Sequence, residues 1–159
     1  MREVDLVIAG LGIRINHVTP ETLDALQSSR VVFYVGKAPG VRELIESCCA
    51  EAVDLSTAYR ENVDRFETYK FMAAVIVDAA LSRSPVTFAE YGHPLVLAQP
   101  SVLTVRAATR LGLRTRVLPA RGARTASPWP PSIPWFPNEP PATHWEVTPA
   151  RQFGHVRSQ

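Results

Sequence analysis

Two short apolar segments of this chain each run directly into a turn that contains glycine. Val4–Ala9 is followed by Gly10-Leu11-Gly12, and Val86–Ala89 is followed by Tyr91-Gly92-His93-Pro94. Short apolar runs that include β-branched residues are typical of buried strands. Because ligands of open α/β sheets bind beyond the carboxyl ends of such strands, the two turns are predicted to form the edge of one ligand cleft.

Strands and helices are expected to alternate over residues 1–119. The expected strands are Val4–Ala9, Val31–Val35, Glu51–Leu55, Val86–Ala89 and, as an outer strand, Arg114–Leu118. The expected helices are Thr19–Ser28, a helix after Pro39-Gly40 that carries Val41, Leu44 and Ile45, then Arg65–Leu81 and Pro100–Leu111. This order predicts an α/β fold with a mostly parallel five-stranded sheet and helices on both faces.

The helix expected over Arg65–Leu81 has the clearest periodicity in the chain. Its inner face is predicted to consist of residues at helical spacing, namely Phe66, Tyr69, Ala73, Ile76, Val77 and Ala80. Arg65 and Tyr69 are four residues apart, so a helix places them on one face. Tyr59 lies in the preceding loop and is expected to fold back over them.

The composition changes at about residue 120. Residues 1–120 hold thirteen basic and thirteen acidic side chains, whereas residues 121–159 carry the formal charge of +2, eight of the fourteen prolines and all three tryptophans. Proline at this density disfavours helices and sheet interiors, so residues 120–159 are expected to form an irregular tail. A neutral domain without a basic stripe argues against nucleic-acid binding.

The rest of the composition favours a cytoplasmic protein with no membrane contact. No signal peptide is expected before the first strand, and no apolar run reaches the length of a membrane span. The two cysteines are adjacent, Cys48-Cys49, a spacing that suits neither a disulfide nor a metal site. They are expected to be reduced thiols near a helix end, and no metal site is predicted.

The glycine turns leave several interpretations open. A dinucleotide-binding turn needs a third glycine where this chain has Ile15, and its helix starts at once rather than near Thr19, so NAD or FAD binding is disfavoured. The first two glycines alone are equally compatible with a tight turn that binds nothing. A single histidine such as His93 is more often a structural hydrogen-bonding residue than a base.

Several motifs together resemble a known family. VDLVIAGLGIRINHVTPETLDAL, VVFYVG and YGHP are similar to the tetrapyrrole methylase superfamily, the class III methyltransferases that use S-adenosylmethionine. Tyr59-x5-Arg65-x3-Tyr69 adds a closer resemblance to the borosin branch, the peptide backbone α-N-methyltransferases. The resemblance covers about residues 4–119. It implies S-adenosylmethionine as cofactor, a peptide or precursor peptide as substrate, and a homodimer.

The resemblance also implies roles for individual residues. The residues expected to bind the cofactor are Gly10, Gly12, Tyr91, Gly92, His93, Pro94 and Val96. The residues expected to be catalytic are Tyr59, Arg65 and Tyr69, with either tyrosine as proton acceptor and Arg65 orienting the substrate and stabilising charge. A nearby guanidinium favours an ionised phenol, which suits removal of an amide proton. Tyr91 is expected at the mouth of the cofactor pocket.

The chain departs from the family pattern at two places. Leu95 stands where the family has a glycine after His-Pro, and Leu118-Pro119-Ala120-Arg121 stands where it continues Leu-Pro-Gly-Val-Ser into a second domain. We therefore expect residues 1–119 to form the first domain, the second domain to be missing, and residues 120–159 to be an out-of-frame or artificially ended segment.

Other interpretations stay open at this point. Tyr69 is also compatible with a core position, and Arg65 with a surface ion pair to Glu61 or Asp64. An enzyme acting on a corrin or another small ring is the alternative within the same reaction class. A non-catalytic binding or assembly module is the alternative of a different class.

Overall fold

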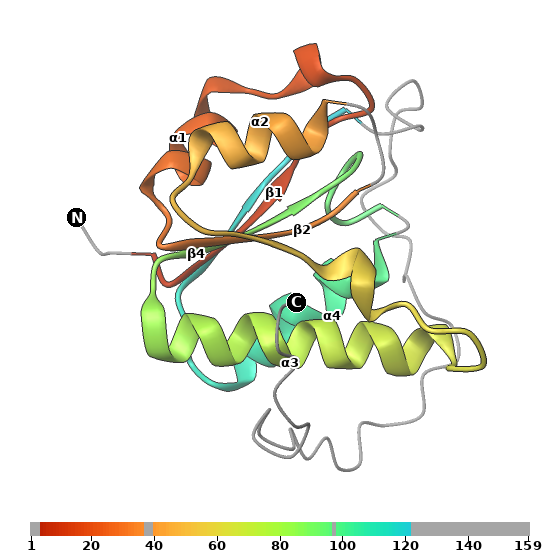
Figure 1. Ribbon diagram of the computed structural model, residues 1–159. Coiled ribbons are helices and arrows are strands. Elements are labelled where there is room, and N and C mark those ends of the chain that lie inside the picture. The colour runs from red at the N-terminus through yellow and green to blue at the C-terminus, as the bar shows by residue number, and fades with distance from the viewer. Residues whose placement is uncertain (1–3, 37–39, 97, 122–159) are drawn as a thin grey trace, which may run out of the picture.

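The computed structural model describes residues 4–36, 40–96 and 98–121 (Figure 1). Its elements are β1 (Leu6–Gly10), η1 (Ile15–His17), α1 (Pro20–Ser28), β2 (Val31–Val35), α2 (Val41–Cys48), β3 (Ala52–Asp54), η2 (Leu55–Ala58), α3 (Arg65–Arg83), β4 (Val86–Glu90), α4 (Gln99–Arg110) and β5 (Thr115–Leu118). The two short 3-10 helices, η1 and η2, were not expected from the sequence. All but the first two residues of the expected tail lie outside the described residues.

The five strands form one parallel sheet in the order β3-β2-β4-β1-β5. The predicted α/β fold with a parallel five-stranded sheet is therefore confirmed, and the last strand lies at an edge, as expected. The third strand is shorter than the predicted Glu51–Leu55, because the chain turns into η2 directly after Asp54.

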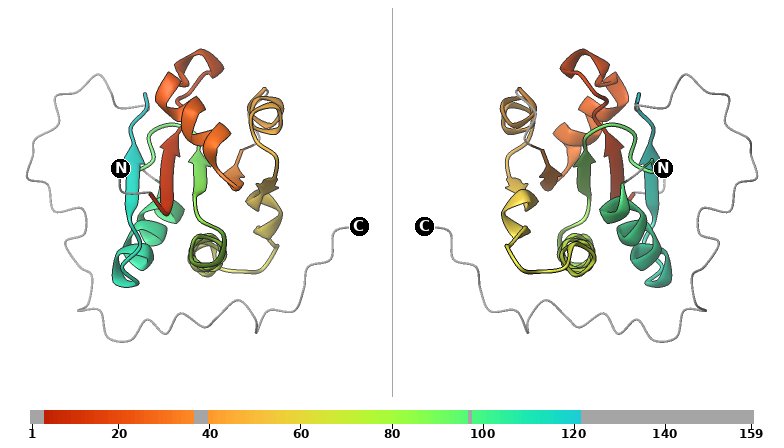
Figure 2. Two further views of the ribbon diagram at one scale, coloured as in Figure 1. Left: turned by 90° about the vertical axis from the view of Figure 1, so that its left-hand side faces the viewer. Right: turned by 90° about the vertical axis from the view of Figure 1, so that its right-hand side faces the viewer.

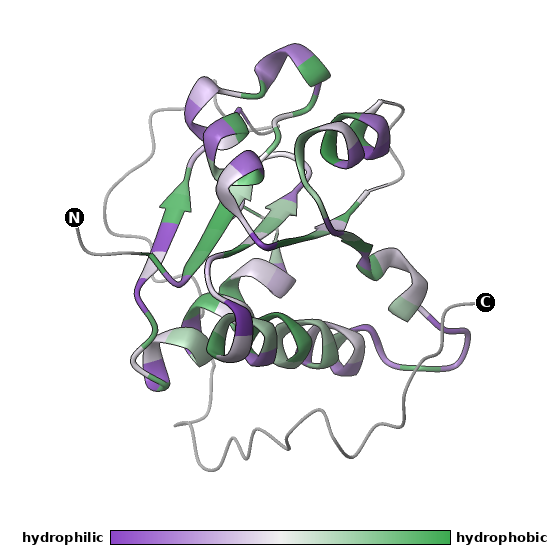
Figure 3. Ribbon diagram, turned by 60° about the vertical axis from the view of Figure 1, so that its left-hand side comes forward, coloured by the Kyte–Doolittle hydropathy of each residue, from purple (hydrophilic) through white to green (hydrophobic). Residues whose placement is uncertain are grey.

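The helices cover both faces of the sheet, as predicted. α1 and α2 lie on one face, and α3 and α4 pack against each other on the opposite face (Figures 1 and 2). Strand alternation directs Leu6 and Ile8 of β1 into the core beneath α3 and α4, whereas Val7 and Ala9 face α1. The central strands are accordingly hydrophobic (Figure 3). Each helix thus buries its apolar side against one face of the sheet.

The ends of the helices follow from side-chain capping. Thr19 precedes α1, and its Oγ1 accepts a hydrogen bond from the Thr22 N–H at 3.1 Å. Asp64 precedes α3, and its Oδ1 accepts from the Phe66 N–H at 2.8 Å. Such caps satisfy N–H groups that have no partner within the helix. Within the described residues, no helix is both long and apolar enough to cross a membrane.

The prediction that Phe66 lies on the inner face of α3 was wrong. Phe66 is 43% exposed and lies on the outer side, where the Lys70 ammonium sits 5.5 Å from the ring centroid. The buried face instead follows Thr68, Met72 and Ile76 at intervals of four residues. Two helical positions correspond to a rotation of about 200°, so Phe66 points away from the face that Thr68 occupies.

Candidate functional site

The carboxyl edge of β1 and β4 is a point where the chain direction switches. These strands are direct neighbours, with Gly10 paired to Glu90 at their carboxyl ends. The chain after β1 leads to α1 on one face, whereas the chain after β4 leads to α4 on the opposite face (Figure 2). Open α/β sheets bind ligands at such a point, where the chain direction switches.

Backbone hydrogen bonds join the two glycine turns at this edge. The Gly12 N–H donates to the Gly92 carbonyl at 3.2 Å, and the Gly92 N–H donates to the Gly12 carbonyl at 2.9 Å. The Tyr91 hydroxyl donates to the Ile13 carbonyl at 3.3 Å, and this side chain is 49% exposed. The predicted proximity of the two turns is therefore confirmed, and it extends the pairing of β1 and β4 beyond the sheet.

The three glycines of the turns have different surroundings. A Cβ on Gly10 would stand 2.6 Å from Ala120 Cβ and 2.8 Å from both the Gly92 carbonyl and Pro94 Cδ. The close approach at Gly10 is therefore made by the protein itself. Gly92 has a φ of +79°, and no heavy atom lies within 4 Å of the place where its Cβ would stand. Of the two, Gly92 is the position that offers open space beside the backbone.

His17 closes the first turn from the η1 side. Gly12 has a φ of +73°, and a Cβ there would stand 2.3 Å from His17 Cβ, so only glycine fits. The Nδ1 atom of His17 is buried and has no hydrogen-bond partner among the described residues. A buried ring nitrogen without a partner is rare in native proteins. Sequence analysis did not single out His17, although a histidine five residues after the second glycine was a visible signal.

Hydrogen bonds between residues close in sequence hold the loop from Gly92 to Val96. The Leu95 N–H donates to His93 Nδ1 at 3.2 Å, and the Val96 N–H donates to the His93 carbonyl at 3.1 Å. Burial lowers the pKa of His93. His93 therefore organises the loop, and Pro94 packs against Gly10. Within the described residues, no three His, Cys, Asp or Glu side chains gather as a metal site would require.

Two tyrosines from separate elements are in contact with each other. Tyr59 follows η2 and Tyr69 lies in α3, and their ring centroids are 6.2 Å apart with the planes at 87°. Tyr69 also packs against the core under α3 and α4, whereas Tyr59 is 40% exposed. The structure therefore brings together the two phenols that the resemblance points to.

The pKa of Tyr59 is raised, whereas the sequence led us to expect that Arg65 would favour an ionised phenol. Desolvation, followed by the Tyr69 phenol and the charge of Glu90, raises the pKa of Tyr59 to about 12. The Arg65 guanidinium opposes this shift, as predicted, but it is the smallest contribution. Tyr59 is thus protonated at neutral pH, and the arginine alone does not produce a resting tyrosinate.

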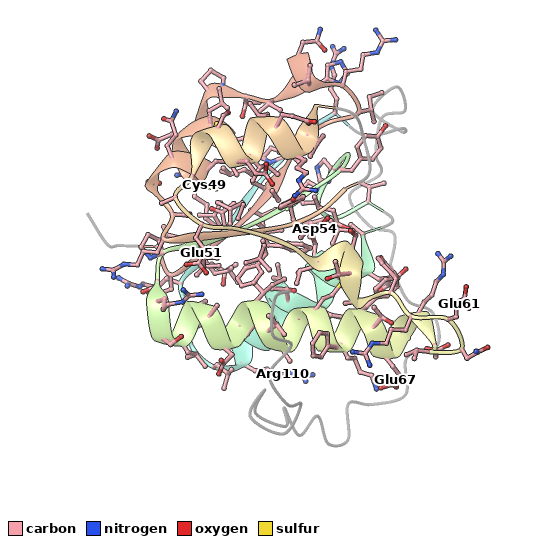
Figure 4. All side chains as sticks on the ribbon, in the orientation of Figure 1. Cys49, Glu51, Asp54, Glu61, Glu67 and Arg110 are labelled. Carbon is pink, nitrogen blue, oxygen red and sulfur yellow. The ribbon has the colours of Figure 1, made fainter. Side chains whose placement is uncertain are left out.

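Arg65 does not form the surface ion pairs considered as an alternative. Its Asp64 neighbour uses its carboxylate to cap α3. Glu61 lies at the outer tip of the loop between η2 and α3 (Figure 4). Arg65 is exposed in the first turn of α3, close enough to Tyr59 for its charge to act on that phenol.

Glu90 is a partly buried acid that was not predicted from the sequence. It is the last residue of β4, directly before Tyr91, and its Oε2 accepts a hydrogen bond from the Ser101 hydroxyl of α4. Burial raises its pKa to about 7, although the Ser101 contacts act in the opposite direction. The available signal was a carboxylate at the end of an otherwise apolar strand. A carboxyl group with a pKa near neutrality can accept and release protons near neutral pH.

Comparison with known proteins identifies the group to which this architecture belongs. The family model described as Tetrapyrrole (Corrin/Porphyrin) Methylases matches residues 5–129. A methyltransferase/ribosomally synthesized type I borosin cyclic peptide precursor of Mycena rosella is 33% identical over 120 residues, 74% of this chain and 30% of that protein. The methyltransferase/ribosomally synthesized cyclic peptide lentinulin A precursor of Lentinula edodes is 31% identical over 119 residues, 74% of this chain and 28% of that protein. The chain thus spans less than a third of the length of these relatives.

Solved structures show the same fold. Uroporphyrin-III-C-methyltransferase from Thermus thermophilus superimposes with a TM-score of 0.55 at 23% identity, over 77% of this chain and 50% of that chain. Diphthine synthase gives a TM-score of 0.57 at 19% identity, over 76% of this chain and 46% of that chain. Together with the family match over most of its length, these findings show that the chain belongs to the tetrapyrrole (corrin/porphyrin) methylase family.

Proposed function

We propose that this chain contributes the first domain of an S-adenosylmethionine-dependent methyltransferase that methylates backbone amide nitrogens of a peptide. Family membership supports the reaction class. The peptide substrate is supported by relatives whose names combine a methyltransferase with a ribosomally synthesized cyclic peptide precursor. Residues 1–119 are the proposed catalytic domain, and the remainder of the site is proposed to come from a second domain.

The glycine turns suit the proposed cofactor. Gly92 leaves open space beside a left-handed backbone, so a ligand can approach its main chain without meeting a side chain. Gly12, Tyr91, Gly92, His93 and Val96 would hold S-adenosylmethionine along the two joined turns. Gly10 and Pro94 would support these turns from behind, because they pack against each other. The cofactor would supply an electrophilic methyl group at this edge of the sheet.

The phenol and guanidinium groups suit an amide acceptor. An amide nitrogen is a poor nucleophile because its lone pair is delocalised into the carbonyl. Its methylation requires removal of the N–H proton and stabilisation of charge on the carbonyl oxygen. We assign proton removal to the Tyr59–Tyr69 pair, and substrate orientation and charge stabilisation to Arg65.

One structural observation carries this proposal. The contact between the Tyr59 and Tyr69 rings lies near Glu90, whose charge acts on Tyr59, and Glu90 ends the strand that leads into the Gly92 turn. Glu90 therefore stands directly before the Gly92 turn, which is proposed to help hold the methyl donor, and its charge acts on Tyr59. Proximity of this kind is what a transfer between two bound substrates requires.

A second candidate substrate is a corrin or another tetrapyrrole ring. The family description and the fold shared with uroporphyrin-III-C-methyltransferase favour it. The Tyr59–Tyr69 pair with Arg65 favours the peptide, because an amide nitrogen must lose its proton in the same reaction. A non-catalytic assembly module is the alternative in which the chain binds no methyl donor.

Calorimetry and mass spectrometry separate these candidates. We expect the chain, joined to the second domain proposed to complete the site, to bind S-adenosylhomocysteine and to add methyl groups to the backbone nitrogens of the unmethylated linear lentinulin A peptide. Fragment-ion masses locate each methyl group on a backbone nitrogen or elsewhere. Absence of S-adenosylhomocysteine binding would favour the non-catalytic module, and methylation of a uroporphyrin ring but not of the peptide would favour the second candidate.

The proposal includes two further properties. We propose a homodimer, which static light scattering tests as a mass twice that of the chain. We also propose a cytoplasmic location, which agrees with the two free thiols of Cys48 and Cys49 at the end of α2.

A further inference from the structure

The side chain of His17 lies directly over the first glycine turn. A Cβ on Gly12 would stand 2.3 Å from His17 Cβ, 3.2 Å from its Cγ and 3.3 Å from its Nδ1. The His17 N–H donates to the Arg14 carbonyl at 2.9 Å, which fixes the main chain of His17 at the end of η1. The imidazole is thus held against the bare main chain of Gly12, the residue that Gly92 joins through hydrogen bonds.

The Nδ1 atom of His17 is buried without a hydrogen-bond partner among the described residues. Within residues 4–36, 40–96 and 98–121, no other buried side-chain nitrogen or oxygen lacks a partner. The buried hydroxyls of Thr22, Ser29 and Thr87, for example, all form hydrogen bonds. A buried polar atom without a partner destabilises a fold, because it has lost water and gained no bond in return. Folding therefore does not account for a polar atom at this position.

Several main-chain donors of the joined turns are already paired within the protein. The Gly12 N–H donates to the Gly92 carbonyl, and the Gly92 N–H donates to the Gly12 carbonyl. In the second turn, the N–H groups of Leu95 and Val96 both donate to His93. These four N–H groups are not available to an anionic group of a ligand, which must find its donor elsewhere. The unpartnered imidazole nitrogen beside Gly12 is able to be that donor.

The surroundings of His17 allow a ligand to reach its ring. The side chain as a whole is half-buried, and Arg14, Ile15 and Asn16 before it are exposed. The torsion about the Cβ–Cγ bond of histidine is broad, so the ring can turn its Nδ1 toward a bound group. Arg14 adds a positive charge to the same exposed segment, which favours an anionic group over a cationic one.

We propose that His17 binds the carboxylate of the methyl donor, by donating a hydrogen bond from Nδ1 to the amino-acid end of S-adenosylmethionine. This inference rests on the proposed function. The carboxylate of an amino acid is ionised at neutral pH. A hydrogen bond to a charged acceptor is stronger than one between neutral groups, so it would recover the free energy lost when Nδ1 is buried. His17 is thus a ligand-binding residue and exchanges no proton in the transfer.

Two ligands that differ only by a carboxylate test this contact. S-adenosylhomocysteine carries the carboxylate, whereas decarboxylated S-adenosylhomocysteine keeps the adenine, the ribose, the sulfur and the amine. Calorimetry measures the dissociation constant of each ligand for the chain joined to the second domain proposed to complete the site. We expect substitutions of His17 to weaken the binding of the first ligand only.

Three variants of His17 identify the nitrogen that acts. Asparagine places an amide nitrogen where Nδ1 stands, glutamine places it where Nε2 stands, and phenylalanine keeps a ring without either nitrogen. We expect His17→Phe and His17→Gln to bind S-adenosylhomocysteine about tenfold or more weakly, and His17→Asn to stay within about threefold of the wild type. Should the larger phenylalanine ring not fit over Gly12, His17→Gln carries the same test. Full affinity in His17→Gln with a loss in His17→Asn would assign the contact to Nε2 and overturn the proposal.

Nuclear magnetic resonance of the wild-type protein, labelled with 15N in histidine, tests the contact without any substitution. Correlation of ring nitrogens with ring protons identifies which nitrogen carries the proton, and His17→Asn identifies the signals of His17 by their loss. S-adenosylhomocysteine should move the Nδ1 signal of His17 to the position of a nitrogen that carries a proton, and the decarboxylated ligand should not. An Nδ1 signal that S-adenosylhomocysteine leaves unchanged would overturn the proposal.

The remaining outcomes are distinguishable. If the wild type binds neither ligand, the proposed function is contradicted, and the role of His17 with it. If the His17 variants weaken both ligands equally, His17 supports the turn or contacts another part of the ligand, and only the carboxylate role is overturned. If the wild type binds S-adenosylhomocysteine and no variant weakens it, the role of His17 is overturned while the proposed function stands.

Discussion

Gly12 and Gly92 each donate a backbone hydrogen bond to the other's carbonyl, at 3.2 Å and 2.9 Å, although about half of the chain lies between them. This reciprocal pair lies beyond the ends of β1 and β4 and fixes the two turns to each other. Both residues have positive φ values, +73° and +79°, which favour glycine. The two glycine turns of the candidate site are therefore joined directly to each other at this edge of the sheet.

Substitution of Gly92 by alanine should separate ligand binding from folding. The positive φ makes alanine unfavourable by about 1–2 kcal/mol, but the space around its Cβ is empty. We expect a modest loss of stability and at least a tenfold weaker affinity for S-adenosylhomocysteine in calorimetry. Gly112→Ala is the matched control, because Gly112 has a φ of +73° and equally open space but lies at the end of α4. Equal affinities in the two variants would argue against ligand contact at Gly92.

Gly10→Ala should destabilise the fold itself. The new Cβ would meet Ala120, Gly92 and Pro94 at distances below 3.0 Å, so β1 and the loop after β4 must move apart. We expect a loss of about 1–3 kcal/mol in the free energy of unfolding, measured with urea. In Gly36→Ala the new Cβ meets only Val41 Cγ1 at 3.4 Å, and the change should be below about 0.5 kcal/mol. Similar losses in both variants would contradict this account of Gly10.

Asp5 should make stability depend on pH at the acidic end. Its carboxylate accepts hydrogen bonds from the N–H, Nε and Nη2 of Arg114 at 2.8, 2.9 and 2.7 Å. These contacts lower its pKa to about 2. A lowered carboxyl pKa stabilises the fold above the ordinary value of 3.8, and this contribution is lost as pH falls through 2. Asp5→Asn should thus be less stable than the wild type at pH 7 in thermal melts. The difference should shrink towards pH 2, and a pH-independent difference would show that the ion pair is not its source.

Glu90 should make stability depend on pH in the opposite direction to Asp5. Its pKa in the folded protein, about 7, lies above the ordinary value of 4.5. Stability from the neutral acid is fully present below pH 4.5 and is lost as pH rises through 7. Glu90→Gln keeps an acceptor for Ser101 and carries no charge, so at pH 8 it should be more stable than the wild type by up to about 3 kcal/mol. Urea unfolding at pH 4.5 and 8 measures this gain, and a gain of equal size at both pH values would contradict it.

In a two-domain version of the protein, Tyr69→Phe should reduce methyl transfer without weakening substrate binding. The ring contact with Tyr59 is kept, but the hydroxyl proposed to take part in proton removal is lost. We expect a decrease of about 100-fold or more in the single-turnover rate, with little change in the peptide dissociation constant. Tyr34→Phe is the control, because Tyr34 is a buried tyrosine on the α1 and α2 side of the sheet. Unaffected turnover in Tyr69→Phe would refute the assigned role.

The order of strands and helices could be predicted because it depends on local patterns. Apolar runs predicted the strands β1, β2 and β4, and Thr19-Pro20 predicted the start of α1. The glycine turns were also visible, because glycines directly after an apolar strand have a specific backbone meaning. The error at Phe66 arose because several helical faces of α3 are apolar, and only contact with the sheet selects one of them.

The sequence by itself determined the alternation of strands and helices, the family resemblance and the residues that form the two turns, because these depend on neighbours along the chain. Only the tertiary structure decided that the pKa of the Glu90 carboxyl group is about 7 and that Tyr59 is held protonated. Both properties depend on the loss of water and on charges from segments distant in sequence. These segments come together only when β4 inserts between β1 and β2.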